Sequence, residues 1–275
     1  MPRFVTSDGL HLHYEEAGEG LPVLCLSGLT RNARDFDFMA PHLTGVRLIR
    51  LDYRGRGQSE WSPDPLSYTV PREAQDVLEL LDHLGLERVA ILGTSRGGLI
   101  AMVLAAMAKH RLLGVALNDI GPELDPGGLD VIMGYLGRHP EAATLEELAV
   151  ARKAALEAKF PGVPLARWRQ EVTHTHVETA QGVRITYDPG LREAVIAAGA
   201  KGAPDLWPLF RAIGPLPCAV IHGANSDLLT EATVARMAAE LPGLIVAHVP
   251  DRAHIPFLDE PQALDALNLW LEQMA

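Results

Sequence analysis

Residues 88–99 read Arg-Val-Ala-Ile-Leu-Gly-Thr-Ser-Arg-Gly-Gly-Leu and are the most informative part of the chain. The apolar run from Arg88 to Leu92 predicts a buried strand, and the segment from Leu99 to His110 predicts a helix. Between them, residues 93–97 have the pattern G-x-S-x-G, followed by another glycine. A serine on such a strand-to-helix turn has a strained backbone and presents its hydroxyl outward, while the glycines prevent collisions with neighbouring chains. We therefore predict that Ser95 is a nucleophile.

A serine nucleophile needs a base that takes its proton and an acid that orients the base. Of the 11 histidines, His254 lies after the last predicted strand and before the last helix, at the edge where all the parallel strands end. Asp227 follows the preceding strand at the same edge and is predicted as the acid. Asp119, at the end of another strand, is the alternative acid, since a carboxylate there could also reach the imidazole. Histidines in predicted strands or in the first hairpin are interpreted as structural: His11, His13, His222 and His248.

Apolar runs recur along the chain at spacings that leave room for helices. They predict strands at residues 22–26, 46–51, 88–92, 113–117, 218–223 and 244–249, after a short antiparallel pair at 3–6 and 10–16. Strands that alternate with helix-length segments imply right-handed crossovers and a parallel sheet covered on both faces. Between Pro122 and Pro204 this rhythm stops and helical segments replace it, which predicts an inserted subdomain.

With these residues the chain resembles the α/β-hydrolase superfamily, of the kind with a helical cap. The order Ser95, Asp227, His254 is the order of that family, and residues 51–59 look like its D-x-R-G-x-G-x-S turn, whose role is mainly structural. The resemblance covers almost the whole chain. It implies a mostly parallel eight-stranded sheet flanked by helices, divided into a core of residues 1–121 and 205–275 and a helical cap of residues 122–204.

The resemblance also implies an oxyanion hole. Ser27-Gly28-Leu29 lies where many members have His-Gly-x, so the matching donors are the backbone N–H groups of Leu29 and Arg96. The departure is Ser27 in place of histidine. It leaves the backbone donor intact but removes an imidazole that often braces this loop.

The reaction implied is cleavage of a carboxylic ester or lactone through an acyl-enzyme on Ser95. A serine nucleophile argues against the haloalkane dehalogenases and epoxide hydrolases of similar shape, which attack with aspartate. C–C bond hydrolysis or perhydrolysis on the same fold remains the alternative, and a receptor without turnover would be favoured only if a triad member were missing. The proline iminopeptidases usually carry Trp after the serine, where this chain has Arg96.

Two further groups of residues are candidates for substrate binding. Arg31 and Arg96 each lie beside an expected oxyanion donor, so their guanidinium groups could bind a substrate carboxylate, or could form salt bridges to acidic neighbours. Trp207 and Trp168 fall in or beside the expected cap, where they either line an apolar pocket or form the core of the cap.

Neither a cofactor nor a metal is expected. His174 and His176 form an H-x-H pair, but at helical spacing they point in different directions and no third ligand is evident. The two cysteines, Cys25 and Cys218, lie in apolar runs, so we expect free thiols rather than a disulfide.

Composition limits the class of partner. The chain has 275 residues with 24 Lys and Arg against 35 Asp and Glu, a net charge of −11 that argues against nucleic acid and anionic membranes as partners. The expected partner is a small acyl substrate, and the oligomeric state is left open. The N-terminus lacks the pattern of a signal peptide and no apolar run is long enough to cross a bilayer, so we expect a cytoplasmic protein.

Overall fold

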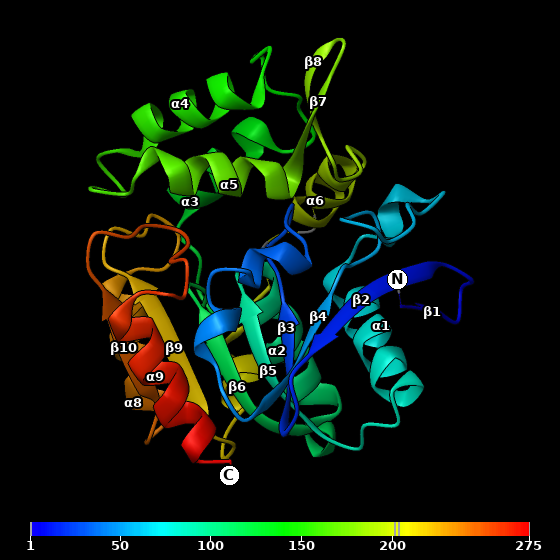
Figure 1. Ribbon diagram of the computed structural model, residues 1–275. Helices are drawn as coiled ribbons and strands as arrows, with labels where there is room; N and C mark the ends of the chain where they lie inside the picture. Colours follow the sequence, from blue (N-terminus) through cyan, green and yellow to red (C-terminus); the bar gives the residue numbers. More distant parts are fainter. Residues whose placement is uncertain (1, 201, 203, 275) are drawn as a thin grey trace.

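The structure, a computed structural model, describes residues 2–200, 202 and 204–274 of the chain. Residues 1 and 275 of the expected core and residues 201 and 203 of the expected cap lie outside this description. An eight-stranded sheet crosses the molecule (Figure 1). Its strands are β1 (Arg3–Val5), β2 (His11–Ala17), β3 (Leu21–Leu26), β4 (Val46–Leu51), β5 (Val89–Thr94), β6 (Leu112–Asn118), β9 (Cys218–Gly223) and β10 (Ile245–Val249).

The strand order is β1-β2-β4-β3-β5-β6-β9-β10. The β1–β2 and β2–β4 pairs are antiparallel, and every pair from β4 to β10 is parallel. The prediction of a mostly parallel eight-stranded sheet is therefore confirmed. Since parallel strands end at one edge, the segments that follow β5, β6, β9 and β10 meet there.

Helices cover both faces of the sheet, as the alternation of side chains along its strands requires. Leu24 of β3 belongs to a buried cluster shared with α1, α2, α7 and α8, whereas its neighbour Cys25 belongs to a cluster shared with α9. These helices are α1 (Val70–His83), α2 (Arg96–Met107), α7 (Trp207–Arg211), α8 (Glu231–Glu240) and α9 (Pro261–Glu272), and the short 3₁₀ turns are η1 (Ala33–Phe36), η2 (Ala40–His42), η3 (Pro65–Ser67) and η4 (Lys109–Arg111).

A separate set of elements lies between β6 and α7. It consists of α3 (Pro126–Tyr135), α4 (Leu145–Leu156), α5 (Leu165–Thr175), β7 (His176–Thr179), β8 (Gly182–Ile185) and α6 (Leu191–Gly199). In Figure 1 these elements, drawn mostly in green, lie over the edge at which β5 ends. Trp168, Phe160 and Val172 form a small core of their own, which Phe257 joins from the other side.

The hairpin β7–β8 departs from the prediction of helices alone in this region. Its two strands pair antiparallel, and Gly182 after the turn has a φ of +92°, a value that favours glycine. The helix containing His174 therefore ends at Thr175, and His176 begins a strand.

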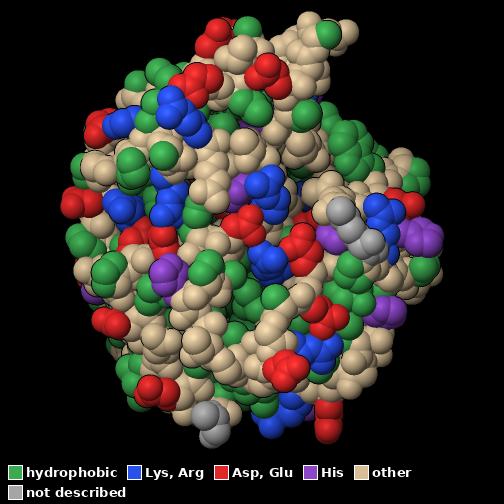
Figure 2. All heavy atoms as spheres, viewed as in Figure 1, with side chains coloured by type: hydrophobic (Ala, Val, Ile, Leu, Met, Phe, Trp, Pro, Cys, Tyr) green, Lys and Arg blue, Asp and Glu red, His purple; other side chains and the backbone are tan. Residues whose placement is uncertain are grey.

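The remaining general features are simple. Cys25 and Cys218 are buried free thiols, as predicted. Among the described residues, the helices are too short or too polar to span a membrane. Figure 2 shows acidic and basic side chains intermixed over the face in view, on the inserted elements as well as on the core.

Candidate active site

Ser95 occupies a sharp turn between β5 and α2. Its φ of +50° and ψ of −115° lie in a region that residues with a Cβ rarely adopt. Glycines permit this turn: a Cβ on Gly93 would lie 2.6 Å from the backbone of Gly97, and one on Gly97 would lie 2.0 Å from the carbonyl oxygen of Leu26. The strand, the turn and the helix thus hold Ser95 as the sequence predicts.

The imidazole of His254 connects Ser95 to a carboxylate. Its Nε2 lies 3.0 Å from Ser95 Oγ, and its Nδ1 lies 2.8 Å from Asp119 Oδ2. Asp119 is fully buried directly after β6, whereas His254 keeps 15% of its side chain exposed. A serine, a histidine and a buried carboxylate in this sequence of contacts can activate the hydroxyl as a nucleophile.

Two other groups fix the carboxylate of Asp119. The backbone N–H of Gly223 donates to Oδ1 over 2.8 Å, and the hydroxyl of Ser226 donates to Oδ2 over 2.6 Å. Together with His254 they give the carboxylate three hydrogen-bond partners, which leaves it a single orientation.

The side chain of Asn118 ties together the segments that carry these groups. Its amide donates to Thr94 Oγ1, next to Ser95, and to the carbonyl oxygen of Pro256, next to the His254 loop, each over 3.2 Å. Asn118 itself precedes Asp119.

The acid in contact with His254 is Asp119, which corrects the prediction of Asp227. Asp227 forms an ion pair with Lys159 and lines a cavity that opens in front of His254. The backbone of the loop after β9 explains the difference. Its third residue, Ser226, turns toward Asp119, and its fourth, Asp227, turns outward to Lys159. Both aspartates follow strands at the same edge, so their positions in the sequence do not distinguish them.

The two expected oxyanion donors lie next to Ser95. Arg96 is the first residue of α2, and a Cβ on Gly28, just before Leu29, would lie 3.8 Å from Ser95 Cβ. Over the described part of the chain, the N–H groups of Leu29 and Arg96 donate to no other backbone group.

A buried ion network supports both donor segments. Arg56 Nε donates to the carbonyl oxygen of Leu29 over 2.9 Å, and its Nη1 lies 2.7 Å from Glu73 Oε1. The other oxygen of Glu73 accepts from Arg96 Nε over 2.5 Å. Burial alone would raise the pKa of Glu73, but the two arginines outweigh it and hold that pKa below its ordinary value. This network braces the segments of Leu29 and Arg96, and the sequence-based prediction did not include the contributions of Arg56 and Glu73.

The arginines predicted as possible carboxylate ligands form salt bridges. Arg96 is occupied by Glu73 and by the carbonyl oxygen of Tyr68, 2.9 Å from Nη2. Arg31 pairs with Asp35 over 2.6 Å and with Glu171 over 3.2 Å. Arg31 also lines the cavity in front of His254, whereas Arg96 is not among the residues that line it.

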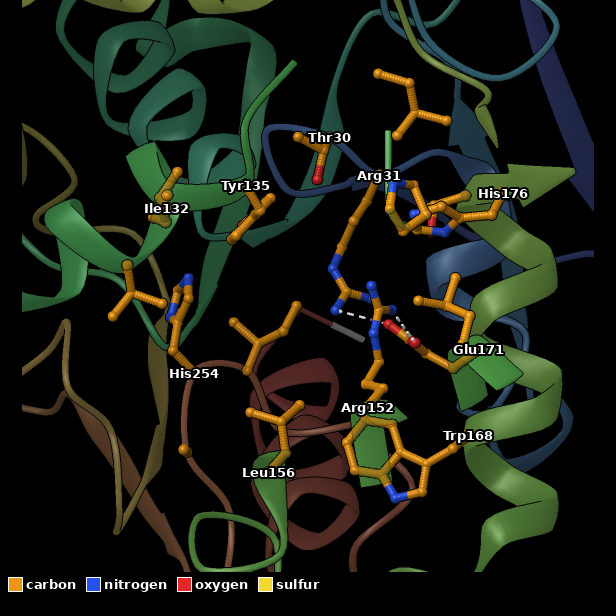
Figure 3. A pocket seen from close by; sticks show the side chains of 18 of the residues that line it. Thr30, Arg31, Ile132, Tyr135, Arg152, Leu156, Trp168, Glu171, His176 and His254 are labelled. Carbon is orange, nitrogen blue, oxygen red and sulfur yellow. Dashed lines mark hydrogen bonds and ion pairs between the residues drawn. The ribbon is translucent and has the colours of Figure 1, made fainter. Parts of the chain in front are cut away.

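A cavity of about 510 Å³ opens between the inserted elements and the edge of the sheet that carries His254. Its apolar wall includes Tyr135, Leu156 and Trp168. Figure 3 shows Arg31 and Arg152 side by side, with Glu171 against their guanidinium groups. Burial would raise the pKa of Glu171, but Arg152 and Arg31 outweigh it and lower that pKa to about 2, so this carboxylate is charged near neutral pH.

Of the two tryptophans considered, Trp168 lines this cavity and Trp207 does not. Trp207 is buried in the core, with its ring at 89° to that of Phe210, and the guanidinium of Arg236 lies 3.7 Å from its centroid. The structure thus does not bring Trp207, predicted as a substrate-binding residue, to this cavity, because α7 turns its side chain toward α2 and the sheet.

Comparison with known proteins agrees with this geometry. The sequence model of the family described as the alpha/beta hydrolase fold matches residues 22–261. The chain belongs to this family. Among curated relatives, this α/β hydrolase is 37% identical to the 3-hydroxybutyrate-oligomer hydrolase of Cupriavidus necator, over 94% of this chain and 92% of that protein. It is 26% identical to the 2-(acetamidomethylene)succinate hydrolase of Mesorhizobium japonicum, over 88% and 84% of the two chains.

Solved structures give the same family. The crystal structure of an alpha/beta hydrolase from Novosphingobium aromaticivorans superimposes on this α/β hydrolase with a TM-score of 0.92 at 37% identity, covering 99% of this chain and 97% of the other. A putative hydrolase from Rickettsia typhi gives a TM-score of 0.85 at 28% identity, covering 96% and 92%.

Proposed function

We propose that this α/β hydrolase is a serine hydrolase that cleaves a carboxylic ester through an acyl-enzyme. The observation that carries the proposal is the hydrogen-bonded chain from Ser95 through His254 to Asp119. Ser95 Oγ attacks the ester carbonyl carbon while His254 Nε2 takes the hydroxyl proton. The proton then passes from Nε2 to the leaving alcohol, and the acyl group stays on Ser95.

Water completes the cycle by the same route. His254 Nε2 takes a proton from the water that attacks the acyl carbon, and returns it to Ser95 Oγ as the acid leaves. Asp119 accepts a hydrogen bond from the N–H at Nδ1 throughout and is not protonated, so it keeps the free lone pair of the neutral imidazole on Nε2 and stabilises the imidazolium that forms. Gly223 and Ser226 hold Asp119 in this orientation.

The negative charge that develops on the carbonyl oxygen is assigned to the N–H groups of Leu29 and Arg96. Arg96 begins α2, so its N–H also lies at the positive end of a helix dipole. The loss of one such donor costs on the order of 10²–10³ in kcat in comparable sites.

The cavity and the relative's name support a proposal for the substrate class. A 3-hydroxybutyrate oligomer is a chain of esters that ends in a carboxylate, and we propose small esters of hydroxy acids with a free carboxylate as substrates. The apolar wall with Trp168 suits the alkyl part. Each guanidinium has five N–H donors, so Arg31 and Arg152 keep donors for the substrate carboxylate beyond their ion pairs with Asp35 and Glu171. In this proposal residues 122–204 act as a cap that selects the substrate.

Activity-based labelling tests the reaction type. We expect a fluorophosphonate to label the wild-type protein and the exposed-site control Ser7→Ala, but not Ser95→Ala, and short p-nitrophenyl esters to be hydrolysed with the same dependence on Ser95. Ester hydrolysis that survives in Ser95→Ala would refute the acyl-enzyme on this residue.

A matched pair of substrates tests the class. The linear dimer of 3-hydroxybutyrate and its methyl ester differ only in the free carboxylate, and a lactone of similar size has neither chain end. We expect a lower KM for the free acid than for the methyl ester, and Arg152→Gln should remove this difference. Arg169→Gln, at an exposed position on α5 paired with Glu146, is the control. Equal KM values for the free acid and its methyl ester would refute recognition of the carboxylate. Faster turnover of the lactone would show that a lactone, not a linear ester, is the preferred substrate.

A further inference from the structure

Three side chains with metal-binding atoms meet outside the active site, at the outer end of the sheet. His222 and His248 are register partners on β9 and β10, so they project from the same face, and Glu231 is the first residue of α8. The two Nδ1 atoms lie 3.2 Å apart, and Glu231 Oε2 lies 3.5 Å from that of His222 and 3.3 Å from that of His248. None of the three is among the residues that line the cavity beside His254.

The size of this triangle fits a tetrahedral ion. Zinc lies about 2.0–2.1 Å from its nitrogen and oxygen ligands, so two ligands of a tetrahedral site are separated by about 3.3–3.4 Å. Neighbouring ligands of an octahedron at the same bond lengths would be about 2.8–3.0 Å apart. The observed edges of 3.2, 3.3 and 3.5 Å are those of a tetrahedron with one position left. Two imidazoles with one carboxylate also form a donor set that suits zinc.

The second ring nitrogen of His222 is held as metal-binding histidines usually are. Its Nε2 lies 3.0 Å from the carbonyl oxygen of Leu229, which can only accept, so the neutral ring carries its proton on Nε2 and its lone pair on Nδ1. His222 is buried and therefore kept in place, whereas the side chains of His248 and Glu231 are 48% and 70% exposed. An ion can enter from solvent, and water can take the fourth position.

We propose that His222, Glu231 and His248 bind one zinc ion. The ion would join β9, β10 and the beginning of α8, and so close both ends of the loop at residues 224–230. Ser226 of this loop donates to the carboxylate of Asp119. The site is structural: it stabilises the core and the loop behind the acid, and it takes no part in the attack on the substrate. This inference does not depend on the proposed ester chemistry.

The test uses the full-length protein, stripped with a chelator and then titrated with zinc sulfate alone. We expect one zinc per chain by calorimetry and by elemental analysis after dialysis, together with a higher Tm, because a ligand that binds only the folded state stabilises it. His248→Ala and Glu231→Gln should each weaken zinc binding by more than about tenfold. Replacing a residue that only contacts a metal ligand already lowers the metal affinity by about tenfold, and His248 and Glu231 would be ligands themselves. His110→Ala, at an exposed histidine elsewhere, should bind as the wild type does.

Cobalt provides a second readout. Co²⁺ in a tetrahedral site gives intense visible absorption, which we expect for the wild type and for His110→Ala but not for Glu231→Gln. Glu231→Gln changes an exposed residue and is expected to fold, and fluorophosphonate labelling of Ser95 checks the active site separately. Zinc bound equally well by Glu231→Gln, or no stoichiometric binding by the wild type, would overturn the proposal and leave the three side chains as a hydrogen-bonded ion pair.

Discussion

Replacing Asp119 by asparagine keeps the size of the side chain and changes the tautomer of His254. The N–H of Gly223 donates to Oδ1, so the asparagine would keep its oxygen there and place its NH₂ group where Oδ2 lies, 2.8 Å from His254 Nδ1. An NH₂ group can only donate, so Nδ1 must accept and the proton must move to Nε2. Nε2 then faces Ser95 Oγ over 3.0 Å with a proton instead of a lone pair.

This tautomer cannot take the hydroxyl proton, and we expect kcat to fall by about 10⁴-fold, the order seen when a triad aspartate is replaced in this way. The loss corresponds to about 5 kcal/mol of activation free energy. Initial rates on a p-nitrophenyl ester measure it, and circular dichroism and Tm check that the variant folds.

Asp227→Asn is the matched comparison, because it makes the same chemical change at the other candidate acid. It removes a partly exposed ion pair with Lys159, whose loss costs about 1 kcal/mol of stability at most, and kcat should stay within about threefold of the wild type. A large loss of kcat in Asp227→Asn together with an active Asp119→Asn would refute the role given to Asp119.

Three further predictions concern the ion network around Glu73, the turn that carries Ser95, and the dependence of stability on pH. Glu73→Gln leaves the two arginines without their carboxylate, so kcat should fall by about tenfold or more at nearly constant KM, and a boronic acid transition-state analogue should bind more weakly; an unchanged kcat would contradict the brace. Gly97→Ala places a Cβ 2.0 Å from a backbone oxygen and should cost at least about 1–3 kcal/mol in urea unfolding, whereas Gly134→Ala, with nothing within 4 Å in α3, should not destabilise the protein. Burial lowers the pKa of His174 to about 4 against an ordinary value of 6.5, so the unfolded chain takes up a proton first as the pH falls, and His174 should account for about 3 kcal/mol of the stability lost between pH 6.5 and 4. Burial lowers the pKa of His176 to about 4 as well, so His176 adds to the loss over the same range. His174→Gln should make the dependence of Tm on pH less steep over that range, and an unchanged slope would contradict the lowered pKa of His174.

The sheet and the place of Ser95 could be predicted because short patterns determine them. A buried strand, a turn with glycines and a helix follow one another within residues 88–110, so no long-range information is needed. His254 could be placed for a similar reason, since it follows the last strand of a parallel sheet and must lie at the edge where Ser95 lies.

The acid could not be chosen in this way. Asp119 comes directly after β6 with a φ of +52°, and Asp227 comes four residues after β9. Which of the two turns inward depends on the backbone path of two short loops. That path is set by contacts such as the one from Ser226 to Asp119, which join residues more than 100 positions apart.

Glu73 could have been noticed. It lies four and seven residues before Val77 and Leu80, on the buried face of α1, and a carboxylate on an apolar helix face needs buried cations. What the sequence does not contain is the identity of those cations. Arg56 and Arg96 come from two different turns, which only the folded sheet brings together.

The place of Asn118 has a consequence for how such a protein can diversify. Asn118 joins the ends of β5 and β6 to the segment after His254, and all three belong to the part of the chain built on the large sheet rather than to the elements inserted after β6. The reacting groups are thus locked to one another without help from the insertion. Recombination could exchange the whole stretch between β6 and α7 for another of different length. Such an exchange would change the lining of the cavity and leave the contacts among Ser95, His254 and Asp119 as they are.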